Sequence, residues 1–316
     1  MKDNFISNLQ NKDHRSIARA ISLIESDNEN ATDLLMKIHS STGNAYRIGI
    51  TGPPGAGKST VTNQLTKFYR KQNKTIGIIA VDPTSPFTGG ALLGDRVRMS
   101  DIGLDSGVFI RSMATRGSLG GLSKKAVDAA DVLDAAGFDL IIFETVGVGQ
   151  SELDIAQAAD TTIVILVPES GDAVQAMKAG LMEIADFFIL NKSDRPGSDQ
   201  AYTALQTILM IKDHDENSWI PKIIKTVASE NKNISDVAAE IENHKTFMKE
   251  KNLFSAKREK QARLRIKEIV EQKLKDKLWG ETGENSLNSI LNRVVLENLS
   301  PYKVADDIIL EFKNRL

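Results

Sequence analysis

The chain has 316 residues, with 40 basic and 42 acidic side chains and a net charge of −2. This near-neutral balance provides no global field that would draw the protein to nucleic acid or to a membrane surface. The sequence has no cysteine, which excludes disulfides, thiolate catalysis and cysteine-bound zinc. No apolar run approaches the roughly eighteen residues that a membrane-spanning helix needs, and we expect a cytoplasmic protein.

Residues 1–45 are predicted to be an N-terminal helical extension that stands apart from the core. Ile17, Ile21 and Ile24 fall on one helical face, and a second amphipathic pattern follows around Leu34. The polar run Ser-Thr-Gly-Asn at 41–44 then interrupts the helical pattern before the first strand.

Residues 46–231 alternate short apolar runs with helical periods, which predicts an α/β fold with a mostly parallel sheet covered by helices on both faces. The expected strands are 46–51, 75–81, 107–111, 140–143, 161–167, 187–190 and 222–226. In such a sheet, ligands collect at the carboxyl ends of the strands.

Residues 232–316 show no further strand pattern and are predicted to be a C-terminal helical region. Between 245 and 277 there are twelve Lys or Arg residues against five Asp or Glu. A nucleic-acid patch is one interpretation, but apolar residues such as Leu264 and Ile269 are interleaved with the charges. This mixture favours a solvated amphipathic arm, which we expect to serve dimerisation.

Residues 52–59 read Gly-Pro-Pro-Gly-Ala-Gly-Lys-Ser and fit the phosphate-binding pattern G-x-x-x-x-G-K-[ST] at every position. The glycines let the backbone curl around a polyphosphate, and the helix that follows adds its positive N-terminal end. Lys58 can reach the β- and γ-phosphates, while the Ser59 hydroxyl can ligate Mg²⁺. The predicted nucleotide-binding residues here are Gly52, Pro54, Gly55, Ala56, Gly57, Lys58, Ser59 and Thr60.

The motif Asn191-Lys192-Ser193-Asp194 follows the predicted strand 187–190 and suits guanine. The Asp194 carboxylate can accept from both N1–H and N2–H₂ of guanine, whereas adenine offers neither donor there. Asn191 is expected to hold the loop and Lys192 to lie over the base. After the last strand, Val227, Ala228 and Ser229 lie where a backbone N–H can reach the guanine oxygen. The predicted ligand is therefore GTP or GDP rather than ATP.

Acidic residues near the ends of strands predict the magnesium site. Asp82 and Glu144 fall on the edge of the sheet that faces the phosphates, and Asp95 can join them from a glycine-rich loop. A helix N-cap or a surface acid is the alternative for each. With Lys58, Asp82 and Glu144 form the predicted catalytic set.

The segment after Glu144 is predicted to respond to the γ-phosphate. Gly147 and Gly149 follow Glu144, as a switch segment would. Gln150 is not spaced like the water-positioning glutamine of signalling GTPases, so we expect slow intrinsic hydrolysis. Residues 168–172, which include Asp172, are a further mobile candidate and lead into a helix that carries Gln175 and Lys178. An ordinary β–α loop with an exposed lysine is an equal alternative for this segment.

The sequence closely resembles the MeaB/ArgK family, the methylmalonyl-CoA mutase-associated GTPases, which are metallochaperone-type P-loop GTPases. The resemblance rests on the phosphate loop, on Asn191-Lys-Ser-Asp194 and on several further motifs. These are Val81-Asp-Pro-Thr-Ser85, Thr88-Gly-Gly, Leu93-Gly-Asp-Arg96, Phe109-Ile-Arg-Ser112, Gly117-Ser-Leu-Gly-Gly121 and Glu144-Thr-Val-Gly-Val-Gly-Gln-Ser-Glu152.

The resemblance implies a GTP-hydrolysing switch that assists an adenosylcobalamin-dependent acyl-CoA mutase, by gating cofactor loading or by protecting or reactivating the mutase. It implies a homodimer joined by helical extensions. It assigns nucleotide and magnesium roles to Lys58, Ser59, Asp82, Asp95 and Glu144, and it puts Asp172, Gln175 and Lys178 in a third switch.

Two alternatives remain at this stage. A P-loop kinase would phosphorylate a small molecule or a transport protein, and the family has also been described as a transport kinase. A nickel-insertion GTPase would share the phosphate loop, but the absence of cysteine and the scattered positions of the four histidines disfavour it.

Overall fold

The computed structural model describes residues 4–26, 29–82, 101–114, 124–145, 151–169, 180–211, 218–296 and 298–314. The chain forms two compact units, residues 1–255 and 256–316.

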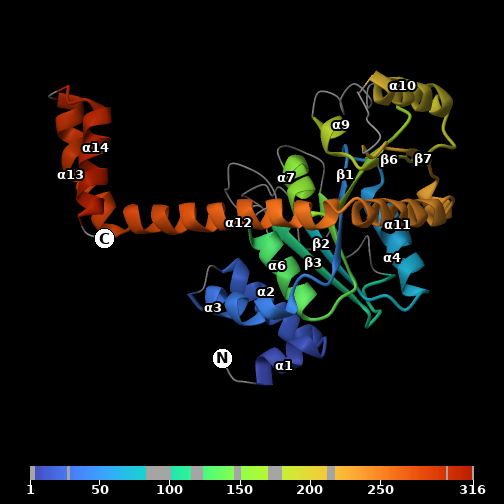
Figure 1. The fold of residues 1–316 in the computed structure, drawn as a ribbon, viewed down its shortest axis with the longest axis horizontal. Coiled ribbons are helices and arrows are strands. Elements are labelled where there is room, and N and C mark those ends of the chain that lie inside the picture. The colour runs from blue at the N-terminus through green and yellow to red at the C-terminus, as the bar shows by residue number, and fades with distance from the viewer. Residues whose placement is uncertain are drawn as a thin grey trace. The chain divides into compact units, whose positions relative to one another are not determined.

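The first unit is built on a seven-stranded parallel sheet in the order β3-β2-β4-β1-β5-β6-β7 (Figure 1). The strands are β1 Tyr46–Thr51, β2 Ile76–Asp82, β3 Val108–Ala114, β4 Leu140–Thr145, β5 Thr161–Leu166, β6 Phe187–Leu190 and β7 Ile223–Lys225. The predicted α/β fold is confirmed, and all seven expected strands are present. The largest displacement is in β3, which was expected at 107–111.

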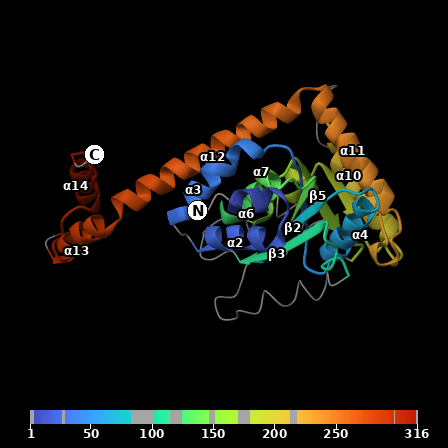
Figure 2. The ribbon, with the colours of Figure 1, turned by 90° about the horizontal axis from the view of Figure 1, so that it is seen from below.

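Helices surround the sheet. Those described in this unit, with two short 3-10 turns, are α1 Asn4–Gln10, α2 His14–Glu25, α3 Glu29–Ile38, η1 His39–Ser41, α4 Lys58–Arg70, α6 Lys124–Ala135, α7 Ser151–Ala158, α9 Leu181–Ile184, α10 Ser198–Ile211, η2 Ala228–Glu230 and α11 Ile234–Glu250. Figure 2 shows α2 and α6 on one side of the strands and α4 and α11 on the other.

The central strands β4, β5 and β6 are buried on both faces, as their continuous apolar sequence predicts. In β4, Ile141 and Phe143 belong to the cluster formed with α2 and α6, while Leu140 and Ile142 belong to the cluster formed with α4 and α11. A third cluster joins β5 and β6 to α9 and α10. Because alternate residues point to opposite faces, neither face of β4, β5 or β6 meets water, whereas the edge strand β7 is only partly buried.

The N-terminal helices do not stand apart from the core, in contrast to the prediction. Leu9, Ile17 and Ile21 are fully buried and share one hydrophobic cluster with Phe143 of the sheet. The apolar face of α2 packs against α6, and α6 in turn covers the strands. Residues 1–45 therefore contribute to the core of the first unit.

Helix α11 also belongs to the first unit, although the sequence assigned it to the C-terminal region. Its Val237 and Ile241 are fully buried against α4. The ring Nδ1 of His244 lies 2.7 Å from Thr161 Oγ1, which in turn lies 2.6 Å from the Tyr46 hydroxyl. This buried polar chain ties α11 to β1 and β5.

The second unit contains most of α12 (Leu253–Leu278), with α13 (Glu281–Leu296) and α14 (Pro301–Lys313). Val304 and Ile308 of α14 are buried, whereas Ile266, Val270 and Leu274 of α12 are exposed at a spacing of four residues. No helix in the described part of the chain combines the length and the apolar character that crossing a bilayer requires.

Candidate functional site

The loop between β1 and α4 has the curled backbone that the phosphate-binding motif predicts. Gly52, Gly55 and Gly57 have φ angles of 137°, 77° and 92°, a region that favours glycine. A Cβ at Gly52 would lie 2.1 Å from the carbonyl oxygen of Ile165, and one at Gly57 would lie 2.3 Å from Nδ2 of Asn191. Glycine is therefore required at Gly52 and Gly57 for both backbone angle and space.

Lys58, the first residue of α4, places its ammonium group in the curve of this loop. Its Nζ donates to the carbonyl oxygens of Gly52 at 2.8 Å and Pro53 at 2.9 Å, and the residue is buried. Within the described residues no side chain caps α4, whose N-cap is Gly57. The N–H groups of the first helical turn and the fixed positive charge thus face the same space, which suits a polyanion.

Ser59 and Glu144 meet at the same edge of the sheet. The Ser59 hydroxyl donates to Glu144 Oε1, and Glu144 is 6 % exposed. Glu144 lies beside Ile50 of β1 and Ala80 of β2 in the sheet register. A hydroxyl and a carboxylate oxygen are the ligand types that Mg²⁺ prefers, so this pair fits the predicted metal site.

The side chains of the other two predicted metal ligands, Asp82 and Asp95, lie outside the described set. Asp82 is the last residue of β2, two positions beyond the register partner of Glu144, and its side chain lies outside the described set. The predicted metal ligand Asp95 lies entirely outside the described residues. So do the predicted switch residues Gly147, Gly149, Gln150, Asp172, Gln175 and Lys178. Among the described residues, no three His, Asp or Glu side chains gather in a metal-binding arrangement.

Asn191 connects the phosphate loop to both predicted guanine-reading segments. Its Nδ2 donates to the Ala56 carbonyl oxygen at 2.9 Å. Its Oδ1 accepts from Thr226 Oγ1 at 3.0 Å and from the Ala228 N–H at 3.1 Å. The side chain is almost completely buried. The three predicted segments are thus joined by one amide group, and the Ala228 N–H is engaged inside the protein.

The residues after Asn191 form a tight turn. Lys192 has a positive φ of 55°, and the backbone N–H and hydroxyl of Ser193 both lie 3.0 Å from the Thr226 carbonyl oxygen. Asp194 and Ser229 are exposed, so a ligand can reach them, whereas Val227 is buried. The two hydrogen bonds of Ser193 hold this residue, directly before Asp194, against Thr226.

Four threonine or serine residues make contacts in the site that were not predicted. Thr226 and Ser193 fasten the guanine-reading segments, and Thr145 Oγ1 donates to Thr51 Oγ1 at 3.0 Å between the ends of β4 and β1. Thr51 directly precedes the phosphate loop and Thr145 directly follows Glu144. The sequence signal for the three threonines was their position at or next to strand ends, and for Ser193 its place inside the 191–194 motif.

A glycine-bent phosphate loop, a buried lysine at the start of its helix and an N-K-x-D segment fastened to that loop define a P-loop GTPase. The comparisons agree with this class. The solved structure of an LAO/AO transport system kinase matches with a TM-score of 0.74 and 26 % identity, covering 98 % of this chain and 97 % of that one.

The curated relatives place the chain more narrowly. A Pyrococcus abyssi protein described as a candidate GTPase is 48 % identical over 98 % of this chain and 97 % of its own length. The GTPase ArgK of Escherichia coli is 34 % identical over 90 % of this chain and 85 % of its own length. Residues 17–283 match the family described as methylmalonyl Co-A mutase-associated GTPase MeaB. The chain belongs to the MeaB family, which confirms the resemblance.

Proposed function

We propose that this GTPase binds GTP with Mg²⁺ and uses the difference between its GTP and GDP states to assist an adenosylcobalamin-dependent acyl-CoA mutase of the methylmalonyl-CoA type. The observation that supports the switch most directly is the Asn191 side chain, which makes the base-reading and phosphate-binding loops one structural unit. The mutase partner rests on family membership.

In the proposed nucleotide complex, the phosphates lie in the curve of residues 52–59. Lys58 and the N–H groups of the first turn of α4 neutralise phosphate charge as it develops during hydrolysis. The Asp194 carboxylate accepts hydrogen bonds from the N1–H and N2–H₂ groups of guanine, and the aliphatic part of Lys192 lies over the face of the base. Ser59, Glu144, Asp82 and Asp95 would hold Mg²⁺, which when bound screens the charge of the β- and γ-phosphates.

Calorimetry with GTP, GDP and ATP tests the base assignment. We expect GTP and GDP to bind at least about a hundredfold more tightly than ATP, because adenine leaves the Asp194 carboxylate without its donors. Asp194→Ala should remove this preference, while Glu230→Ala, an exposed acid in the neighbouring 3-10 turn, should keep it. Equal affinity of the unaltered protein for ATP and GTP would refute the assignment.

The switch is tested by pull-down of a purified adenosylcobalamin-dependent methylmalonyl-CoA mutase with GDP and with a non-hydrolysable GTP analogue. We expect recovery that depends on the nucleotide, and slow GTP hydrolysis that the mutase accelerates. Recovery that is equal in both states would remove the switch, and no recovery would remove the mutase as the partner.

Three further features belong to the same proposal: a homodimer formed by the C-terminal helices, the absence of nucleic-acid binding, and a cytoplasmic location. The exposed residues Ile266, Val270 and Leu274 support dimerisation, because a row of apolar side chains on one helix is suited to pairing. Light scattering of the full chain should give twice the 34.6 kDa chain mass. A monomer at micromolar concentration would contradict it.

A kinase remains the second candidate, because the matching solved structure is titled a transport system kinase. The two functions differ in where the γ-phosphoryl group goes. Labelled phosphate recovered as the inorganic ion supports the GTPase switch, and label on an added amino-acid-binding protein would support the kinase.

A further inference from the structure

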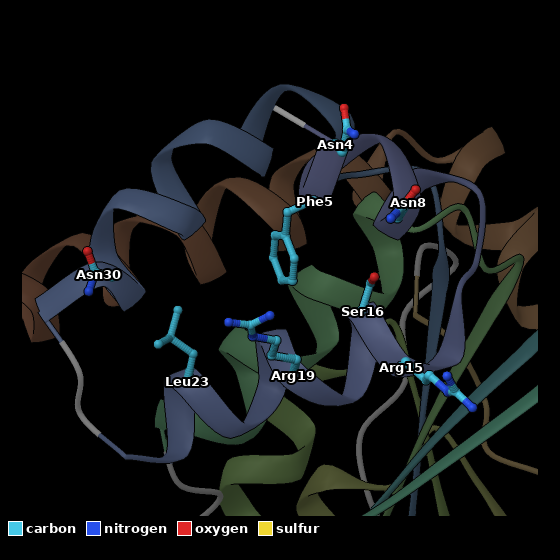
Figure 3. A pocket seen from close by; sticks show the side chains of 8 residues that line it. All are labelled: Asn4, Phe5, Asn8, Arg15, Ser16, Arg19, Leu23 and Asn30. Atoms are coloured by element: carbon cyan, nitrogen blue, oxygen red, sulfur yellow. The ribbon is translucent and has the colours of Figure 1, made fainter. Parts of the chain in front are cut away.

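A groove of about 640 Å³ lies among the three N-terminal helices, away from the nucleotide loops (Figure 3). Its volume falls in the range of about 300–1,000 Å³ that ligand sites in proteins occupy. It is lined by Asn4, Phe5 and Asn8 of α1, Arg15, Ser16, Arg19 and Leu23 of α2, and Asn30 at the start of α3.

The groove has an apolar centre crossed by a positive charge. Phe5 and Leu23 are partly buried at its base, where they pack on the core cluster. The guanidinium of Arg19 extends from α2 toward the space between these two side chains (Figure 3). Arg15 lies one helical turn earlier on α2, and its side chain points away from Phe5 and Leu23 (Figure 3), so Arg19 supplies the charge at the centre of the groove. A ligand seated here therefore needs an apolar group next to a negative charge.

The acids nearest in sequence do not neutralise Arg19, although the Asp13 carboxylate interacts electrostatically with Arg15. The Asp13 carboxylate caps α2 through the N–H and hydroxyl of Ser16, Glu25 pairs with Arg111, and Asp33 pairs with Lys37. Within the described part of the chain, neither Arg15 nor Arg19 forms an ion pair. The charge on this wall is therefore available to a carboxylate from outside.

The rim of the groove favours a peptide over a simple lipid-like acid. Asn4 and Asn8 lie one helical turn apart on α1 and are both exposed. A carboxamide presents two N–H donors and one carbonyl acceptor, so it can pair with both the N–H and the C=O of an extended backbone. A fatty acid has no groups along its chain that would use such a rim.

We propose that this groove binds an extended acidic segment of a partner protein, with a carboxylate on Arg19 and a neighbouring apolar side chain between Phe5 and Leu23. The contact gives the GTPase a docking point that is separate from its nucleotide loops, so a partner can remain bound while those loops change state.

The test is an array of octapeptides probed with the full-length protein. The peptides contain acidic, basic or neutral polar residues and all have the same apolar content. We expect the bound peptides to be enriched in Asp or Glu next to an apolar residue. Arg19→Gln should weaken the best soluble peptide roughly tenfold or more, since a charge-assisted hydrogen bond is lost. Arg263→Gln, which removes the same charge from exposed α12, should have no effect.

Phe5→Leu supplies a second test of the apolar pocket and should weaken the same peptide while GTP affinity stays unchanged; since Phe5 packs on the core cluster, a small fall in melting temperature is expected as well. The proposal is overturned by an array without acidic enrichment, or by equal binding of the peptide to wild type and Arg19→Gln. It is also overturned if acetate or inorganic phosphate alone binds as tightly as the best peptide, because the groove would then be a site for a simple anion only.

Discussion

Replacing Asn191 by alanine tests whether one amide group holds the site together. The side chain is 3 % exposed and takes part in three hydrogen bonds, to the Ala56 carbonyl, the Thr226 hydroxyl and the Ala228 N–H. Each net hydrogen bond is worth about 1 kcal/mol, and the partners left behind are buried, so we expect a loss of roughly 3 kcal/mol in the free energy of unfolding. For a unit of this size that corresponds to a melting temperature lower by about 6–12 °C.

Thr226→Val is the matched control, because it removes only one of the three bonds and preserves the side-chain shape. It should cost about 1 kcal/mol, a third of the cost of Asn191→Ala. Both variants can be followed by thermal unfolding and by the affinity for a fluorescent GDP analogue. Equal destabilisation by the two substitutions, or an Asn191→Ala variant that binds GDP as wild type does, would refute the role of Asn191 as a connector.

Three other substitutions are expected to act through separate causes. Gly57→Ala should destabilise the protein more than Gly55→Ala. Both glycines have positive φ, but only at Gly57 would the new Cβ clash, lying 2.3 Å from Asn191 Nδ2. Equal melting temperatures of the two variants would contradict this. Glu144→Gln keeps an acceptor for the neighbouring hydroxyl but removes the charge, so Mg²⁺-dependent GTP hydrolysis should fall on the order of 10–100-fold without loss of stability, and an unchanged rate would exclude a metal role. The hydrogen-bonded ion pair with Arg70 lowers the pKa of Asp105 below its ordinary 3.8, so the pair stabilises the fold above that pH and the benefit is lost as the pH falls through the lower value. Asp105→Asn should therefore lower the melting temperature near neutral pH, and a gap to wild type that persists at pH values well below 3.8 would refute this linkage.

The strands and the phosphate loop could be predicted because each depends on local chemistry. The β5 strand, Thr161–Leu166, is a short β-branched run buried on both faces, and that pattern is readable without knowledge of its neighbours. The bend at Gly57 follows from a motif in which only glycine accepts the backbone angle. The contact between Asn191 and the phosphate loop was only partly predictable. The motif indicated that Asn191 holds a loop, but it did not indicate which carbonyl oxygen the side chain would contact.

The features that the sequence did not reveal depend on which elements become neighbours. The helical period of Ile17 and Ile21 defines a buried face but cannot specify that the partner is α6, so the N-terminal helices were expected to stand apart. Likewise, the Thr51–Thr145 contact arises because β1 and β4 pair with Ile50 beside Glu144. A register of this kind is a property of the assembled sheet and leaves no local pattern at either threonine.

The Asn191 connection also bears on how this site distinguishes nucleotides. The base-reading turn at 191–194 and the phosphate loop share a buried amide, so a displacement of one loop moves a hydrogen-bond partner of the other. If Asp194 binds guanine as proposed, a base that does not pair with it leaves the turn without ligand contacts, and we expect this loss to affect the Ala56 carbonyl of the proposed phosphate loop through Asn191. Discrimination against adenine should therefore appear as weaker phosphate binding as well as weaker base binding, and the Asn191→Ala variant should lose part of this coupling even though Asp194 is intact.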